Sequence, residues 1–244
     1  MAQPPNLSTH AAYDTLPRDG LPVAVDNYIK KNLHSATYHS PFETIREASL
    51  AAGLPDIACS EPQAKFLMLQ ARMCNAKRIL EVGTLGGYSA AWFATTSPET
   101  KVTTIEVDED RVTLARQNLE KAGLSQQVEV LHGRAITVLQ GIREQVQNHE
   151  REVFDFAFID ANKQDNLAYF KLALEITRDR AIIIVDNVVR NGKVASAEEA
   201  EKDDVIKGTR DLIESIGRME DVVATAIQTV GEKNYDGFLI AMKK

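Results

Sequence analysis

The sequence is short of several features that would define its class. It has only two cysteines, Cys59 and Cys74, with no metal-like spacing and too few for a disulfide framework. No apolar run reaches the roughly 18 residues that a membrane-spanning helix needs. Residues 1–10 are polar and lack the basic and apolar regions of a signal peptide. We therefore expect a protein of a reducing, cytoplasmic compartment that does not enter a membrane.

Positive charge is also scarce. Lys and Arg number 28 against 35 Asp and Glu, which gives a formal net charge of −7. Proteins that bind nucleic acids usually carry a basic face, and no lysine or arginine cluster indicates one here. We therefore expect a small-molecule partner and no nucleic acid. With 244 residues, of which 44% are hydrophobic, the chain can form one α/β domain with a helical extension.

The extension comes first in the chain. Helical apolar spacing over 21–34 and 41–53 predicts two helices, the second with Pro41 in its first turn. Ser60 and Gln63 predict a capped start for a third helix. We therefore divide the chain into an arm with helices, residues 1–59, and a domain, residues 60–244. The arm is expected to cover the site or to contact a second copy.

From residue 78 onward the sequence alternates between strand and helix patterns. This alternation is typical of βαβ units that build a parallel sheet with helices on both faces. A charged helix is predicted over about 196–217, and the runs 221–230 and 237–242 should pair as an antiparallel hairpin because no helix fits between them. The five earlier strands are predicted at 78–82, 101–107, 127–131, 154–159 and 181–186, with helices at about 87–97, 109–122, 134–146 and 164–178.

A glycine-rich turn follows the first strand. Gly83, Gly86 and Gly87 can take positive φ angles and allow a ligand to approach the main chain. Ser89 is expected to cap the next helix, whose free N–H groups favour a nucleotide-like or carboxylate-bearing ligand. The spacing differs from the dinucleotide-binding G-x-G-x-x-G, which would need a glycine at Leu85. A tight turn without a ligand is the alternative.

Polar side chains stand where three of the strands end. Glu106 ends the second strand, where an acid can accept hydrogen bonds from a ribose diol or can simply be a surface acid. Asp160 ends the fourth strand and Asp186 with Asn187 the fifth, and these two strands should be neighbours. Ligands in open α/β sheets bind at the carboxyl ends of the strands. Two carboxylates and an amide oxygen suit Mg²⁺, although each residue could merely cap the helix or turn that follows.

Lys163 lies one short turn beyond Asp160. A neighbouring cation would favour its neutral amine, which could then act as a general base. An exposed lysine with no role in chemistry is the alternative.

Together, in their order and spacing, these motifs resemble the cation-dependent O-methyltransferases, the family of the caffeoyl-CoA and catechol O-methyltransferases. The resemblance implies the class I methyltransferase (Rossmann-like) α/β fold, with strand order 3-2-1-4-5-7-6. It also implies S-adenosylmethionine as the methyl donor. It extends from about Ser60 to the C-terminus and rests on the segments Leu80–Thr84, Gly87–Ser89, Ile105–Asp108, Phe154–Lys163 and Val185–Asn187.

The resemblance also implies roles for individual residues on the donor side. Glu106 would hold the ribose, and Ala135, next to Gly133 and Arg134, would lie by the adenine. Glu81 would border the methionine end of the donor. The full set of implied donor-binding residues is Glu81, Gly83, Thr84, Ser89, Glu106, Ala135 and Asp160.

On the acceptor side, the resemblance implies a metal site made by Asp160, Asp186 and Asn187. Mg²⁺ is the expected ion, with Mn²⁺, Ca²⁺ and Zn²⁺ as alternatives. Lys163 matches the proposed base and forms the catalytic pair with Asp160, while Asn187 and Asn191 fall where relatives contact the acceptor. The implied reaction moves a methyl group to a hydroxyl of a catechol-like or other phenolic small molecule.

Several readings compete with this one. A class I methyltransferase that works without metal is the nearest alternative. A nicotinamide-dependent oxidoreductase and a non-catalytic binding protein are alternatives of other classes. Arg190 stands where plant members of the family have tryptophan, which argues against a coenzyme A thioester as acceptor. Family resemblance also implies a homodimer.

Overall fold

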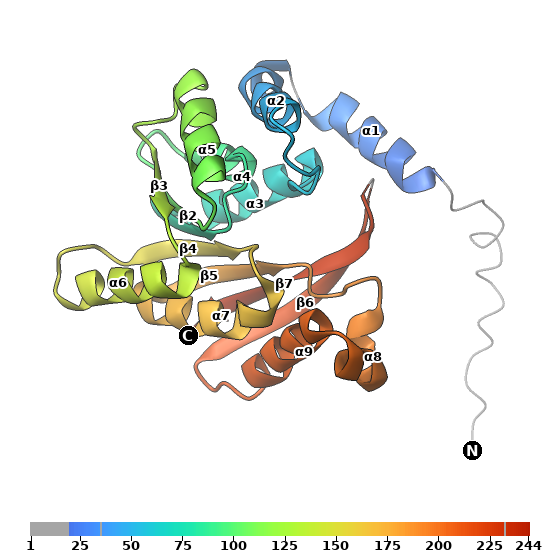
Figure 1. Ribbon diagram of the computed structural model, residues 1–244, viewed down its shortest axis with the longest axis vertical. Helices are drawn as coiled ribbons and strands as arrows, with labels where there is room; N and C mark the ends of the chain where they lie inside the picture. The colour runs from blue at the N-terminus through green and yellow to red at the C-terminus, as the bar shows by residue number, and fades with distance from the viewer. Residues whose placement is uncertain (1–19, 35, 232) are drawn as a thin grey trace.

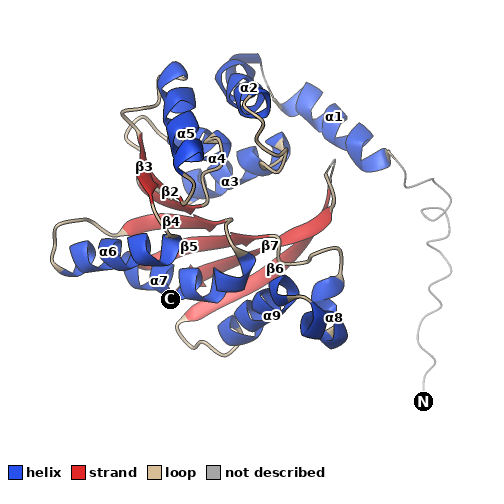
Figure 2. Ribbon diagram, viewed as in Figure 1, coloured by secondary structure: helices blue, strands red, loops and turns tan. Residues whose placement is uncertain are grey.

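The protein is built around a seven-stranded, twisted sheet with helices packed on both faces (Figures 1 and 2). The computed structural model describes residues 20–34, 36–231 and 233–244. The strand order is β3-β2-β1-β4-β5-β7-β6, which confirms the expected order and the class I methyltransferase fold. Among these residues, no helix is both long enough and apolar enough to cross a membrane.

Five parallel strands and an antiparallel hairpin make the sheet. Val82 at the end of β1 pairs with Ile105 of β2 and Ile159 of β4, so the carboxyl ends of these strands lie at one edge. Asp186 at the end of β5 pairs with Phe238 of the antiparallel β7. The strands are β1 (Arg78–Val82), β2 (Lys101–Glu106), β3 (Val128–His132), β4 (Phe154–Ile159), β5 (Thr177–Asp186), β6 (Val222–Val230) and β7 (Tyr235–Lys243).

Side-chain alternation along the strands supplies the sheet with two apolar faces. Ile79 and Phe156 point to one face, where Phe156 lies 5.5 Å from the Phe93 ring. Leu80 and Ala157 point to the other face. The first face is covered by α2 (Ala36–Ala51), α3 (Glu61–Met73), α4 (Tyr88–Ala94) and α5 (Glu109–Lys121), and the second by α6 (Ala135–Gln147), α7 (Asn166–Ile176) and α9 (Asp204–Ile216).

The remaining elements lie at the periphery: α1 (Leu21–Leu33), the short helices η2 (Lys163–Asp165) and η3 (Lys193–Ala195), and α8 (Ala197–Lys202). His34, which follows α1, is buried and lies 2.6 Å from Glu61 Oε1 of α3. Phe42 of α2 stacks on Trp92 of α4 at 4.5 Å. The first two helices are thus packed onto the body of the protein by buried side chains.

Several predicted element boundaries are wrong, and three of them differ most from the structure. α2 begins at Ala36 and contains Pro41, although proline is more common in a first turn. The charged helix is two helices, because Asp203 is extended and its side chain accepts the Val205 N–H at 2.8 Å, which starts α9 anew. β5 begins at Thr177, before the predicted residue 181.

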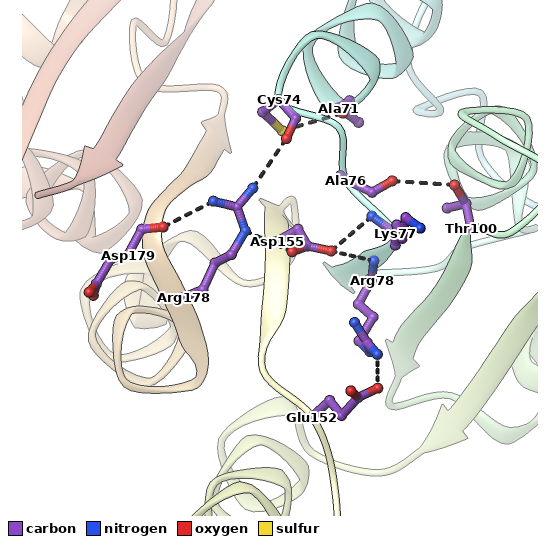
Figure 3. Close-up of polar contacts among 10 residues, drawn as sticks. All are labelled: Ala71, Cys74, Ala76, Lys77, Arg78, Thr100, Glu152, Asp155, Arg178 and Asp179. Atoms are coloured by element: carbon purple, nitrogen blue, oxygen red, sulfur yellow. Dashed lines mark hydrogen bonds and ion pairs between the residues drawn. The ribbon is translucent and has the colours of Figure 1, made fainter.

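A polar network holds the amino-terminal edge of the sheet, opposite the carboxyl ends (Figure 3). Asp155 Oδ2 accepts hydrogen bonds from the backbone N–H groups of Lys77 and Arg78, both at 2.8 Å. Arg178 donates to Asp155 Oδ1 at 2.7 Å and to the carbonyl of Cys74 at 3.1 Å. Burial raises the pKa of Asp155, but these hydrogen bonds outweigh it and the net shift is downward. The network ties β1, β4 and β5 to the end of α3.

Candidate functional site

The glycine turn after β1 is tightly packed, and each glycine has its own reason. Gly83 has φ 104°, and a Cβ there would meet the carbonyl oxygen of Asp160 at 2.1 Å. Gly86, by contrast, does not have the expected positive φ. It is required because a Cβ would lie 2.0 Å from Ser49 Oγ of α2. The turn is thus held between β4 and α2.

The start of α4 differs from the sequence prediction. Gly87, with φ 88°, is the N-cap, and no side chain caps the helix. Ser89 is therefore not the cap: it lies in the first turn, where its hydroxyl faces Glu81. α4 therefore begins directly after the glycine turn, at the carboxyl edge of the sheet, and the free N–H groups of a helix start favour an anionic ligand.

Glu81 is a fully buried carboxyl group in the middle of the sheet. Thr104 donates a hydrogen bond to its Oε2 at 2.6 Å, and the hydroxyls of Thr84 and Thr104 lie 2.6 Å apart. Among the described residues, Oε1 has no hydrogen-bond partner. Burial raises the pKa of Glu81 to about 7, a shift that Ser89 and Thr104 partly oppose. A cationic group of a ligand would satisfy this carboxylate.

Glu106, at the end of β2, shapes the next loop. Its Oε2 accepts the Leu85 N–H at 2.9 Å, and its Oε1 accepts the N–H groups of Val107 at 3.0 Å and Asp108 at 3.1 Å. The side chain is 6% exposed. Glu106 therefore joins the glycine turn to the β2–α5 loop and keeps one lone pair, on Oε2, for a ligand at the same edge.

The loop after β3 lies beside Glu106. Gly133 has φ 147°, and its N–H donates to the Glu106 carbonyl at 2.9 Å. Arg134 is the N-cap position of α6 but makes no side-chain cap, and Ala135 is the first residue of the helix. The structure thus brings the predicted adenine loop to the same edge as the predicted ribose residue.

Asp160 and Asp186 meet at the ends of β4 and β5. One carboxylate oxygen of each, together with Cys59 Sγ, lies within 4.8 Å of the others. Gln63 of α3 donates to Asp186 Oδ2 at 2.9 Å. Burial, and secondly the negative charge of Asp160, raises the pKa of Asp186 to about 7. The buried Asp186 carboxylate and the half-buried Asp160 carboxylate repel one another, a setting in which a bound cation is strongly favoured.

Lys163 forms an ion pair with Asp160 from the short helix η2. Its side chain is only 12% exposed, so it is not the exposed lysine of the alternative interpretation. The segment is held in place by α9, where a Cβ at Gly208 would lie 2.8 Å from the Lys163 carbonyl oxygen. The amine therefore has a defined position next to the two carboxylates.

The two asparagines differ in their surroundings. Asn187 follows Asp186 directly, is half-buried and has φ 59°, and its N–H donates to Asp186 Oδ1 at 2.8 Å. Asn191 is exposed on the loop after β5, where its N–H donates to the Tyr235 carbonyl at 3.1 Å. Asn187 is thus at the carboxylate pair, whereas Asn191 lies further along the loop.

Three residues of this edge were not identified from the sequence. Thr104 is a polar residue inside a buried strand, which is the one signal that could have singled it out. The sequence pattern predicts only a capping-box role for Gln63, but its side chain reaches Asp186 instead. Cys59 carries no motif at all. Gln63 and Cys59 lie more than a hundred residues before Asp186 in the chain, so only the packing of α3 reveals them.

The chain is similar in sequence and structure to known O-methyltransferases. The sequence model of the O-methyltransferase family matches residues 32–241. The O-methyltransferase imqG of Aspergillus flavus is 42% identical over 223 residues, 91% of this chain and 90% of that protein. A catechol O-methyltransferase of Mycobacterium tuberculosis is 41% identical over 80% of this chain and 84% of its own length. The crystal structure of the Bacillus cereus O-methyltransferase in complex with SAH is 43% identical, with a TM-score of 0.84 over 91% of this chain and 97% of that one.

Proposed function

The chain belongs to the O-methyltransferase family and is an S-adenosylmethionine-dependent enzyme; on that premise we propose that it methylates a hydroxyl of a catechol-like phenolic molecule with the help of a divalent cation. The observation that carries this proposal is the meeting of the Asp160 and Asp186 carboxylates beside Lys163. Family membership removes the nicotinamide-dependent oxidoreductase and the non-catalytic binding protein. Metal-independent methyl transfer stays as the alternative.

The donor is proposed to bind along the carboxyl ends of β1 and β2. Glu81, buried and with one oxygen free of partners among the described residues, suits the ammonium group of the donor. Glu106 would accept a hydrogen bond from the ribose diol, and Ala135 would lie at the adenine end. Gly83 would border the donor, and it must be a glycine because a side chain there would strike the Asp160 backbone.

The residues present fit a divalent cation. Asp160, Asp186 and Asn187 would hold it through oxygen atoms, the donor type that Mg²⁺ and Mn²⁺ prefer. When bound, such an ion supplies positive charge that relieves the repulsion between the carboxylates and eases loss of a proton from a nearby phenol. Gln63 orients Asp186 by its hydrogen bond to Oδ2.

Lys163 is proposed to take the proton from the acceptor hydroxyl. In the described structure its Nζ is paired with Asp160. Any positive charge that engages Asp160 weakens this pair and favours the neutral amine, which can then accept a proton. The resulting phenolate is the nucleophile that takes the methyl group from the donor sulfur, and the strand ends hold both reactants in contact.

A catechol-like acceptor is favoured over a larger thioester. Two curated relatives named catechol O-methyltransferase are 39% and 41% identical, whereas five named caffeoyl-CoA O-methyltransferase are 26–28% identical. The Arg190 guanidinium lies 3.9 Å from the buried Asp236 carboxylate, so this loop presents a charged side chain in place of the plant tryptophan. Asn187 and Asn191 would border the acceptor on the same loop.

The test is a methyl-transfer assay with S-adenosylmethionine and a vicinal diphenol, before and after chelation. We expect activity to vanish with chelator and to return with Mg²⁺ or Mn²⁺. Asp186→Asn should lower turnover at least about a hundredfold while donor binding persists. Asp179→Asn, on the same strand but exposed, is the matched control and should retain activity. Full turnover in chelator would establish metal-independent transfer instead.

We also infer that the protein forms a homodimer through its N-terminal helix and terminal hairpin. On α1, Val25 and Tyr28 are 54% and 71% exposed, and Val230 at the end of β6 is 66% exposed. The two segments are neighbours, because a Cβ at Gly231 would lie 3.2 Å from Asp26 Oδ2. Exposed apolar side chains on two neighbouring segments support an interface with a second copy.

A further inference from the structure

Cys59 occupies an unusual position for a thiol that carries no motif. It immediately precedes Ser60, the N-cap of α3, and is 6% exposed. Its Sγ and one carboxylate oxygen each from Asp160 and Asp186 all lie within 4.8 Å of one another. Within the described part of the chain, no hydrogen bond involves this sulfur. A buried, unpartnered thiol thus faces the same space as the two carboxylates.

The position of Cys59 is held from two sides. The side chain of Gln63, in the first turn of α3, donates to Asp186 Oδ2 at 2.9 Å, and Ser60 Oγ accepts the Gln63 N–H at 3.4 Å. The first bond docks the start of α3 onto the end of β5, and the second caps the helix. Lys233 adds a tie from the hairpin, because its Nζ donates to the Ala58 carbonyl at 2.7 Å. The thiol is therefore fixed next to the carboxylates by the chain on both sides of it.

The other cysteine, Cys74, lies at the opposite edge of the sheet from the carboxylates. Cys74 follows α3 at its far end, and its Sγ donates to the carbonyl of Ala71 at 3.3 Å (Figure 3). It belongs to the network of Asp155 and Arg178 at the opposite edge of the sheet. Cys74 therefore has a partner and no carboxylate pair, and it serves as the natural control.

We propose that Cys59 is a further ligand of the metal site, one that adds a soft sulfur to a set of hard oxygens. This inference rests on the proposed cation site. Carboxylate and amide oxygens alone favour Mg²⁺ and Mn²⁺, whereas thiolate sulfur favours Zn²⁺, Co²⁺ and Cd²⁺. Binding of such an ion releases the thiol proton to solvent and leaves the sulfur as a thiolate ligand.

The consequence is a site with two modes. With Mg²⁺ the ligands are the oxygens of Asp160, Asp186 and Asn187, and Cys59 stays a thiol. With Zn²⁺ or Co²⁺, Cys59 joins Asp160 and Asp186. The ratio of Co²⁺ to Mg²⁺ affinity should therefore depend on Cys59, and replacement of the sulfur should lower this ratio by at least about tenfold.

Cobalt provides a readout that is independent of catalysis. The full-length protein is titrated with Co²⁺ while the near-ultraviolet sulfur-to-cobalt charge-transfer band is recorded, and calorimetry measures binding in parallel. The wild-type protein and Cys74→Ser should develop the band to saturation at one ion per chain. Cys59→Ser should lack the band. It should bind Co²⁺, but more weakly than the wild-type protein does. Cys59→Ala, which removes the hydroxyl as well, should behave the same way.

A second variant links the sulfur to the carboxylates. Asp186→Asn keeps Cys59 but removes one negative ligand, so it should develop the band only at higher Co²⁺ concentration. Persistence of the band in Cys59→Ser overturns the proposal, as does a wild-type protein that binds Co²⁺ without the band. In that case Mg²⁺-dependent methylation would leave the proposed function intact. A wild-type protein that binds neither Co²⁺ nor Mg²⁺ overturns both.

Discussion

The side chain of Asp236, in β7, accepts a hydrogen bond from the backbone N–H of Val189 at 3.0 Å. The same oxygen, Oδ1, also accepts the N–H groups of Arg190 at 2.9 Å and Gly237 at 3.0 Å. Asp236 is 3% exposed. The terminal hairpin thus holds the loop that leaves Asp186 and Asn187. Arg190 and the next residue have φ near 55°, a conformation that non-glycine residues adopt at a cost of about 1–2 kcal/mol.

The first prediction follows from the three hydrogen bonds that Asp236 accepts. Asp236→Ala should release the loop and raise the acceptor KM more than it changes donor affinity. It should also lower the free energy of unfolding by about 1–3 kcal/mol, because three N–H groups lose their acceptor. Asp236→Asn, which retains an oxygen, should have smaller effects. Equal loss of donor and acceptor binding in Asp236→Ala, measured by calorimetry and kinetics, would contradict a local role.

The second prediction concerns Glu106. Loss of a charge-assisted hydrogen bond to the donor should cost on the order of 1.5–3 kcal/mol, so Glu106→Ala should weaken donor binding at least about tenfold. The exposed neighbour Glu109 offers a matched control, and Glu109→Ala should bind the donor as the wild-type protein does. An unchanged dissociation constant for Glu106→Ala in calorimetry would remove this residue from the donor site.

The third prediction uses the raised pKa of Glu81, about 7 against an ordinary 4.5. Below this pKa the carboxyl is neutral and cannot pair with the donor ammonium, so donor affinity should rise about tenfold from pH 6 to pH 8. Without donor, the sign is opposite: the folded state holds an extra proton between about pH 4.5 and 7, so this contribution to stability is lost as the pH rises. Glu81→Gln should flatten both profiles. A pH dependence of donor binding that survives in Glu81→Gln would assign it to another group.

The fourth prediction concerns the network at the opposite edge of the sheet. The pKa of Asp155 is lowered in the folded protein, so its contribution to stability is complete above its unfolded pKa and is lost as the pH falls through the folded pKa. Asp155→Ala should lower the denaturation midpoint at neutral pH and leave donor affinity unchanged. Asp179→Ala removes an exposed carboxylate nearby and serves as the control. Loss of donor binding in Asp155→Ala would show that the network reaches the site.

The fifth prediction tests the dimer. Light scattering at micromolar concentration should give twice the mass of one chain, and Val230→Glu should lower it because a charge would be buried at the interface. Met73→Glu changes a side chain that is 71% exposed on a different surface and should leave the dimer intact. A wild-type protein that has the mass of one chain would end the proposal.

The sequence by itself determined the type and order of most elements. Buried strands and amphipathic helices follow from local apolar periodicity. The lack of a helix pattern between the last two strands required the antiparallel hairpin of β6 and β7 that the sheet contains. The sequence also predicted that the polar residues at the strand ends lie together, because parallel strands end at one edge of the sheet. Asp160 and Asp186 meet there as the pattern predicted.

Only the tertiary structure decided what surrounds these residues. Gln63 reaches Asp186 across 123 positions of sequence, and Cys59 faces the carboxylates because the start of α3 docks onto β5. The Ser89 hydroxyl faces Glu81 instead of capping α4. Position 86 must be a glycine because a Cβ there would strike Ser49 of α2. Local patterns report whether a side chain is buried, since periodicity follows burial. They do not report which distant segment is packed against it, and that packing sets the chemistry of this edge.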